Sequence, residues 1–167
     1  MHNNFNNAYP ADKKEMYKLL ASQMKALLEG ETNTTANLAN ASALINEALS
    51  GINWAGFYLM DNEELVLGPF QGKVACVRIP VGRGVCGTAV KENATQLVMD
   101  VHNFPGHIAC DSASKSELVI PLRHEGVAMG VLDIDSPQIG RFDNTDAEEL
   151  EKIARIIEEA CQWKGNR

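Results

Sequence analysis

Three of the four cysteines, at positions 76, 86 and 110, fall in the middle of the chain and could perform thiol chemistry. Cys110 lies in the polar sequence His-Ile-Ala-Cys-Asp-Ser, where we expect an exposed thiol that is open to reaction. Cys86 follows a glycine-rich run, and Cys76 lies in a segment with strand character. A buried free cysteine is often only a small hydrophobic side chain, which explains Cys161 well and Cys76 adequately, but not Cys110. We therefore favour a redox role for Cys110.

Two other kinds of site are weighed against this interpretation. His107 and Cys110 could supply two metal ligands, but no Cys-x-x-Cys pair accompanies them, so we predict no metal site. Residues 82–87 fit the dinucleotide-binding pattern Gly-x-Gly-x-x-Gly. Only residues 88–95 separate this run from the next expected strand, which is too short for the crossover helix of a Rossmann unit. The glycines are instead predicted to form a tight turn that points Cys86 into a pocket.

Acidic and aromatic side chains are spaced so that they share strand faces. Asp133 and Asp135 alternate along an apolar segment, so both should project from one face of a strand. A solvated strand end is the ordinary explanation of this pair, but Glu117 opens the neighbouring expected strand and favours a binding site with three carboxyl groups. Trp54 and Tyr58 also share a face, and core packing and the aromatic wall of a pocket explain them equally well.

The composition excludes several classes of function. The net charge of −7, with no cluster of lysine or arginine, disfavours binding to nucleic acid or to a membrane surface. No apolar stretch approaches the roughly 20 residues of a membrane-spanning helix. The first seven residues lack the basic and apolar regions of a secretory signal, so we expect a cytoplasmic protein. In that reducing compartment, cysteines are more often free, catalytic or metal-bound than joined in structural disulfides.

Apolar periodicity predicts an α+β fold in the order α-α-β-β-β-α-β-β-β-α. Helices are expected over residues 12–30, 34–49 and 88–92 and from residue 145, where Thr145-x-x-Glu148 fits a capping box, and strands over 53–61, 64–70, 75–81, 96–100, 117–122 and 127–134. Short turns between strands favour antiparallel pairing, which predicts a central sheet of about six strands with helices packed on one face. Residues 1–10 are predicted to be a flexible segment, and residues 11–163 a single domain.

With these residues in view, the chain resembles the free methionine-(R)-sulfoxide reductases, which are single-domain GAF proteins. The spacing of the three central cysteines is specific to these reductases, whereas the GAF fold alone is not. The resemblance implies that residues 11–163 form one GAF domain. The similar stretches are residues 52–58, 68–72, 76–90, 104–111, 116–121 and 130–136.

The resemblance also implies a mechanism and partners. Cys110 would attack the sulfur of free methionine-R-sulfoxide, releasing methionine and leaving a sulfenic acid. Cys76, or Cys86 as the alternate, would condense with the sulfenic acid to give a disulfide. No bound cofactor is implied, and the thioredoxin system (thioredoxin, thioredoxin reductase and NADPH) would reduce the disulfide. A homodimer is expected, with the N-terminal helices as its interface.

The carboxyl groups fit this mechanism through their crowding. Three negative charges should raise the pKa of a neighbouring thiol and of at least one carboxyl group. A protonated Glu117 or Asp135 could then donate to the sulfoxide oxygen, while the remaining carboxylates hold the ammonium group of the substrate. Trp54 and Tyr58 would pack against its thioether methyl end.

Two other classes of GAF protein compete with the enzyme. One is a ligand-sensing module without catalysis, although such modules are commonly joined to output domains. The other is a redox sensor in which Cys86 and Cys110 form a regulatory disulfide. Repeated turnover of a small sulfoxide distinguishes the enzyme from both.

Overall fold

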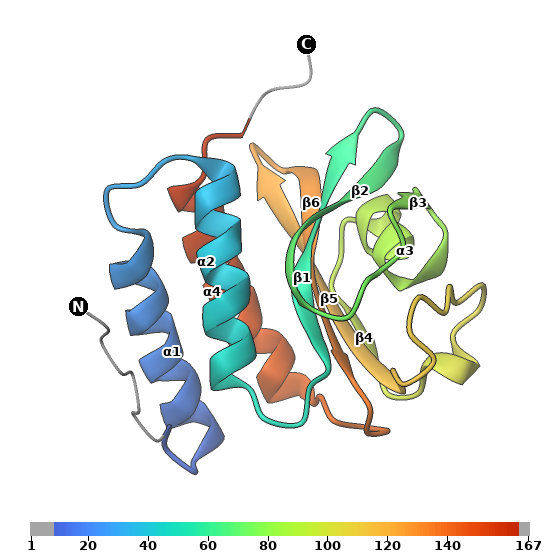
Figure 1. The fold of residues 1–167 in the computed structure, drawn as a ribbon, viewed down its shortest axis with the longest axis horizontal. Coiled ribbons are helices and arrows are strands. Elements are labelled where there is room, and N and C mark those ends of the chain that lie inside the picture. The colour runs from blue at the N-terminus through green and yellow to red at the C-terminus, as the bar shows by residue number, and fades with distance from the viewer. Residues whose placement is uncertain (1–8, 164–167) are drawn as a thin grey trace.

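A six-stranded antiparallel sheet separates two unequal layers in the computed structural model, which describes residues 9–163 (Figure 1). The elements are α1 (Lys13–Leu28), α2 (Thr34–Ala48), β1 (Trp54–Asp61), β2 (Glu64–Gly72), β3 (Arg78–Pro80), α3 (Gly84–Glu92), β4 (Gln96–Val98), the 3-10 helix η1 (Val101–Asn103), β5 (Ser116–His124), β6 (Val127–Ser136) and α4 (Asn144–Ala160). The strands lie in the order β3-β2-β1-β6-β5-β4, and every neighbouring pair is antiparallel. The predicted α+β order and sheet are therefore confirmed. The flexible segment predicted for residues 1–10 falls largely outside the described residues.

Helices α2 and α4 pack on one face of the sheet, as predicted, and α1 packs against these two helices (Figure 1). Their apolar stripes bury the alternate residues of β1, β5 and β6 that point toward them, because successive strand residues face opposite sides. The strand residues in this core are Ala55, Phe57, Leu118, Ile120, Leu122, Leu132 and Ile134. No helix in residues 9–163 is long and apolar enough to cross a membrane.

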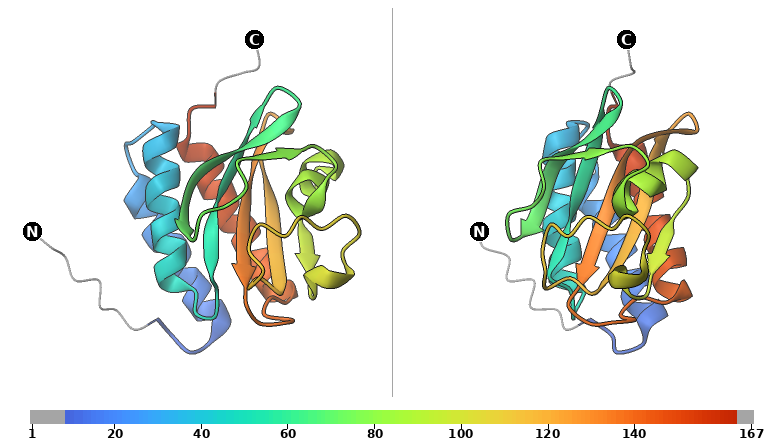
Figure 2. Two further views of the ribbon diagram at one scale, coloured as in Figure 1. Left: turned by 45° about the vertical axis from the view of Figure 1, so that its right-hand side comes forward. Right: turned by 90° about the vertical axis from the view of Figure 1, so that its right-hand side faces the viewer.

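The opposite face carries a thinner cover, made of α3, the edge strands and two loops. Figure 2 shows α3 and the loop leading into β5 on the side of the sheet away from the three long helices. The smaller core beneath this cover contains Trp54, Tyr58, Val85, Cys86, Val119 and Val131. Because the cover is mostly loop, polar side chains of β5 and β6 lie within reach of a cavity here.

The structure corrects two predictions in this cover. Helix α3 begins at Gly84, four residues before the predicted start, so the predicted tight turn is limited to the start of the glycine run, where the N–H of Arg83 donates to the carbonyl oxygen of Pro80 at 3.1 Å. Gly84 has φ +62°, which few other residues adopt, and a Cβ on Gly87 would lie 2.4 Å from the carbonyl oxygen of Pro80. The glycines thus allow the start of α3 to pack closely on β3. The predicted strand over residues 75–81 is also shorter, because only Arg78–Pro80 pairs with β2.

The start of α4 differs from the prediction as well. Asp143 is the N-cap residue, and its side chain accepts from the backbone N–H of Asp146, whose own side chain accepts from the Asp143 N–H. The capping box therefore lies two residues before the predicted Thr145 and Glu148. Asp146 is also the partner of Lys13, a long-range contact that local sequence does not reveal.

Candidate active site

A small cavity of about 40 Å³ lies between the sheet and the cover formed by α3 and the loops. Side chains of β1, β5, β6 and α3 line it, together with the loops that precede β3 and β5. Its described lining includes three carboxyl groups from the neighbouring strands β5 and β6, but neither lysine nor arginine. The described lining of the cavity is therefore acidic and contributes neither a lysine nor an arginine cation.

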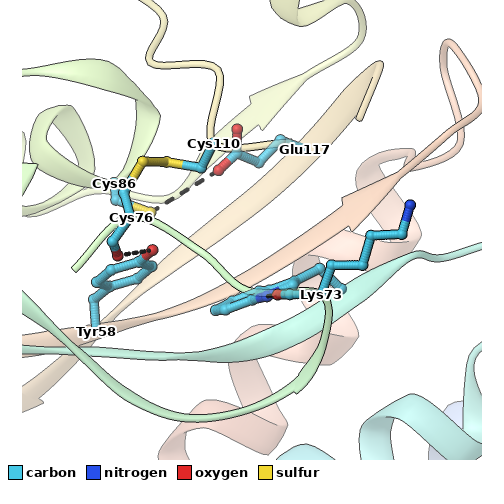
Figure 3. Close-up of a disulfide and its surroundings, with 7 residues drawn as sticks. Tyr58, Lys73, Cys76, Cys86, Cys110 and Glu117 are labelled. Atoms are coloured by element: carbon cyan, nitrogen blue, oxygen red, sulfur yellow. Dashed lines mark hydrogen bonds between the residues drawn. A yellow bond between two sulfur atoms is a disulfide. The ribbon is translucent and has the colours of Figure 1, made fainter. Parts of the chain in front are cut away.

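A disulfide joins Cys76 and Cys110 at the cavity (Figure 3). The sulfur atoms are 2.00 Å apart and the Cα atoms 5.5 Å, although 34 positions separate the two residues in the chain. Both cysteines lie in loops and are half-buried, so a reductant can reach the bond. The hydroxyl of Tyr58 donates to the carbonyl oxygen of Cys76 at 2.9 Å, which anchors this loop to β1.

Glu117, Asp133 and Asp135 form the acidic side of the cavity. Glu117 lies opposite Asp135 in the β5–β6 register, and Asp133 lies two residues away on the same face. Burial and the neighbouring Asp133 and Asp135 raise the pKa of Glu117 well above the usual carboxyl range, and burial and Asp133 do the same for Asp135. Burial also raises the pKa of Asp133, whose Oδ1 is buried without a hydrogen-bond partner. The cluster therefore retains protons at a pH where exposed carboxyl groups have lost them.

Cys86 is a free thiol on α3 and is only 4% exposed. Its Sγ lies 3.9 Å from Oε1 of Glu117. Burial, together with the charges of Asp133 and Glu117, raises the pKa of the thiol well above its usual value. In this state Cys86 is therefore protonated and a poor nucleophile.

Trp54 and Tyr58 form the aromatic wall of the cavity. Their rings stack with centroids 5.9 Å apart, and Phe70 stacks on Trp54 at 5.1 Å. The Trp54 indole N–H donates to the carbonyl oxygen of Lys73 at 3.1 Å. The two aromatic residues thus belong both to the small core and to the cavity wall, which combines the two interpretations of the sequence.

Comparison with known proteins identifies the family. The GAF domain family matches residues 37–162. A relative from Escherichia coli K12, named free methionine-R-sulfoxide reductase, is 56% identical over 147 residues, covering 88% of this chain and 89% of its own. A Saccharomyces cerevisiae relative of the same name is 47% identical over 161 residues, covering 92% and 89%. The chain belongs to the free methionine-R-sulfoxide reductases.

A solved structure of this family supports the same assignment. The X-ray structure of the free methionine-R-sulfoxide reductase from Neisseria meningitidis in complex with its substrate matches with a TM-score of 0.87 at 47% identity. The match covers 92% of this chain and 93% of the Neisseria chain. The resemblance inferred from the cysteine spacing, and the GAF fold that it implied, are thus confirmed.

The structure gathers the predicted site residues of this reductase-family chain in one place. Seven of them line the cavity, namely Trp54, Tyr58, Cys86, Cys110, Glu117, Asp133 and Asp135. Cys76 joins them through its disulfide with Cys110. It lies in the loop between β2 and β3, whereas the sequence predicted a strand position. The roles assigned to these residues remain predictions.

Sequence analysis did not single out several other residues that line the cavity. Asp111 and Ser114 lie in the loop after Cys110, and the Asn53 amide donates to both, at 3.3 Å and 3.1 Å. His107, which the sequence suggested only as a possible metal ligand, also lines the cavity, and burial and nearby His102 lower its pKa. Asp111 directly follows Cys110 and Ser114 lies four positions after it, so closeness to Cys110 in the sequence is the signal that could have identified them.

Proposed function

We propose that this reductase reduces free L-methionine-R-sulfoxide to L-methionine, with its own thiols as the source of electrons. The observation that carries the proposal is the Cys76–Cys110 disulfide at a cavity whose described lining holds the buried carboxyl groups of Glu117 and Asp133, the half-buried carboxyl group of Asp135, and neither lysine nor arginine. The disulfide is the expected product of one turnover. The cavity needs a positive group from its ligand, which the ammonium of a free amino acid supplies.

The thiol chemistry proceeds in two balanced steps. The Cys110 thiolate attacks the sulfoxide sulfur, and the oxygen takes up one proton from a carboxyl group of the cavity. The bond between the substrate sulfur and the oxygen breaks, so that Cys110 becomes a sulfenic acid and methionine is released. The Cys76 thiol then attacks the Cys110 sulfur, expelling water and forming the disulfide. The observed pairing supports Cys76 as the resolving thiol, since Cys86, the alternate, is buried and free.

The carboxyl groups divide between proton donation and substrate binding. A protonated Glu117 or Asp135 donates to the sulfoxide oxygen and makes the sulfur more electrophilic. Asp133 accepts from the substrate ammonium through Oδ1, the oxygen that has no partner in the protein. A methionine sulfoxide within a peptide has no ammonium there, and its binding would leave this buried acceptor unpaired. Trp54 and Tyr58 pack against the methyl end.

The enzyme also needs a reductant, a cellular compartment and an oligomeric state. Thioredoxin, kept reduced by thioredoxin reductase and NADPH, resets the disulfide in a cytoplasmic compartment, and no bound cofactor takes part. Two copies of the chain associate through their N-terminal helices. Sulfoxide-dependent NADPH consumption that requires thioredoxin checks the first statement, and the molar mass in solution checks the second.

The central test is release of methionine from free methionine-R-sulfoxide with excess dithiothreitol. Wild type and Cys161→Ser, which alters a free thiol outside the cavity, should turn over repeatedly. Cys110→Ser should release none. If wild type and Cys161→Ser are also inert while their Cys76–Cys110 disulfide still forms under oxidant, the chain is a sensor and not an enzyme.

A further inference from the structure

The donor atoms of Cys86, Glu117 and Asp133 form a close group with ligands of two chemical kinds. One thiol sulfur and one oxygen from each carboxyl group all lie within 4.8 Å of one another. Each of the three residues is more than nine-tenths buried, with exposures of 4%, 7% and 5%. Around tetrahedral zinc, with Zn–S of about 2.3 Å and Zn–O of about 2.1 Å, ligand atoms lie about 3.5 Å apart. Shifts of about 1 Å would therefore bring the three atoms onto one ion.

A second observation indicates that these three residues can bind a positively charged ligand. Oδ1 of Asp133 is buried at the cavity and has no hydrogen-bond partner. A buried acceptor without a partner is costly, so such atoms usually meet a ligand, ion or water. No lysine or arginine among the described lining residues supplies the missing charge. The substrate ammonium is one solution, and a metal ion is another.

The donor set selects among metal ions. Magnesium and calcium prefer all-oxygen surroundings with six or more ligands, whereas a thiolate with two carboxylates suits zinc. Three protein ligands leave the fourth tetrahedral position open for water. The adjoining cavity of about 40 Å³ has room for it, since a water needs roughly 10–15 Å³.

We propose that Cys86, Glu117 and Asp133 bind one Zn²⁺ per chain, and that the ion blocks the cavity. Binding replaces the proton of the thiol and any proton on the two carboxyl groups, so it releases protons to solvent. The three ligands come from α3, β5 and β6, which explains why no spacing motif for zinc occurs in the sequence. The ion occupies the carboxylate that we assign to the substrate ammonium, so zinc excludes the substrate. This exclusion rests on the proposed function, whereas the metal site itself does not.

The experiment uses the full chain with the Cys76–Cys110 disulfide intact, so that only Cys86 and Cys161 offer thiols. Calorimetric titration with zinc chloride gives the stoichiometry and the proton release. Cobalt chloride serves as a second probe, since a thiolate ligand adds a sulfur-to-cobalt charge-transfer band in the ultraviolet. Wild type and the matched control Cys161→Ser should each bind one ion per chain and show the band.

Two variants decide the outcome. Cys86→Ser should lose the charge-transfer band and bind zinc at least about 10-fold more weakly. Asp133→Asn, which keeps the thiol and the shape of the side chain, should also bind at least about 10-fold more weakly, with circular dichroism confirming the fold of each variant. Absence of zinc binding in wild type, equal affinity in wild type and Cys86→Ser, or magnesium binding as tight as zinc would each overturn the proposal. None of these readouts depends on turnover, so failure of the site is distinct from failure of the reductase function.

Discussion

Asp146 and Asp133 are both buried aspartates, but they lie on opposite sides of the sheet and have opposite surroundings. Asp146 accepts from the Tyr17 hydroxyl at 2.6 Å, and Nζ of Lys13 lies 2.9 Å and Nη1 of Arg141 3.6 Å from its carboxylate. Asp133 instead faces Glu117 and Cys86, with one oxygen unpaired. The first carboxylate is fully partnered by its own chain, whereas the second is not.

The difference in partners indicates different roles. Asp146 stabilises the fold, whereas Asp133 has an oxygen that is free to bind a ligand. Asp146 ties α1 to α4 in the helical layer, so its pairing is complete when the protein folds. The crowding around Asp133 disfavours ionisation and so destabilises the folded state at neutral pH. A bound ammonium group or metal ion would relieve that cost, which links stability to ligand binding on this face only.

The largest difference between the two aspartates is expected in enzyme activity, and Asp133→Asn should have the larger effect on it. The amide cannot balance the substrate ammonium, so kcat/KM for free methionine-R-sulfoxide should fall by about 100-fold or more, about 3 kcal/mol. Thermal stability should stay the same or rise, because a crowded carboxyl group is gone. Steady-state kinetics and melting temperature measure the two effects. Unchanged kcat/KM would exclude Asp133 from substrate binding.

The matched substitution in the helical layer, Asp146→Asn, should lower stability and leave activity unchanged. Asp146→Asn leaves Lys13 and Arg141 without their buried anion, so the free energy of unfolding should fall by about 2–3 kcal/mol. Activity of the folded fraction should be unaffected, because the residue lies across the sheet from the cavity. Urea titration and activity at a temperature well below the melting transition test this pair of outcomes. A loss of activity without a loss of stability would break the comparison.

The pH dependence of stability should also differ in sign between the two faces. The folded-state pKa of Glu117 is raised above 4.5 by burial and by Asp133 and Asp135. Above pH 4.5 the unfolded chain has released a proton that the folded chain still holds, so this group lowers stability as pH rises through its folded pKa. Gln cannot ionise, so the melting temperature of Glu117→Gln should rise relative to that of wild type as pH increases above 4.5.

Asp143, which lies beside Asp146, should give the opposite dependence of stability on pH. A hydrogen bond from the Asp146 backbone and the neighbouring Lys13 lower the pKa of Asp143 to about 2. Its contribution is present above pH 3.8 and is lost as pH falls toward 2, so Asp143→Asn should be less stable than wild type above about pH 4, and the difference should shrink as pH falls toward 2. Melting curves across pH test both variants. A constant offset between Glu117→Gln and wild type at every pH would contradict the assigned ionisation.

The smallest effects are expected from a pair of tyrosines. Tyr17 donates to Asp146, and Tyr58 donates to the carbonyl oxygen of Cys76. Tyr17→Phe and Tyr58→Phe should each lose about 1 kcal/mol of stability. Only Tyr58→Phe should also slow formation of the Cys76–Cys110 disulfide, since that hydroxyl anchors the loop. Denaturant titration and stopped-flow quench with disulfide mapping distinguish the two variants.

Regular elements account for what the sequence could predict. Side chains alternate on a strand, so the spacing of Asp133, Ile134 and Asp135 was enough to place two carboxyl groups on the face opposite the helical core. Glu117 followed from the same rule on the next strand. The long helices were equally accessible, because their apolar stripes recur over several turns.

The features that the sequence could not predict lie in loops or depend on partners far apart in the chain. The position of Cys76 depends on where β3 ends, and no local pattern distinguishes a three-residue edge strand from a longer one. Thr145 and Asp143 both satisfy the sequence pattern of an N-cap, and contacts with distant Lys13 accompany the one that is used. The cysteine pairing was suggested by family resemblance, since spacing alone left both Cys76 and Cys86 open.

The disulfide also encloses almost the entire cover of the cavity within one covalent loop. Residues 76–110 contain β3, α3, β4 and η1, so oxidation closes a ring around these elements and reduction opens it. A loop of this length restricts the unfolded chain by about 4 kcal/mol in the entropic account. Each catalytic cycle would therefore constrain the cover when the disulfide forms and free it when the disulfide is reduced. The oxidised enzyme should resist local opening and proteolysis of the cover better than the reduced enzyme.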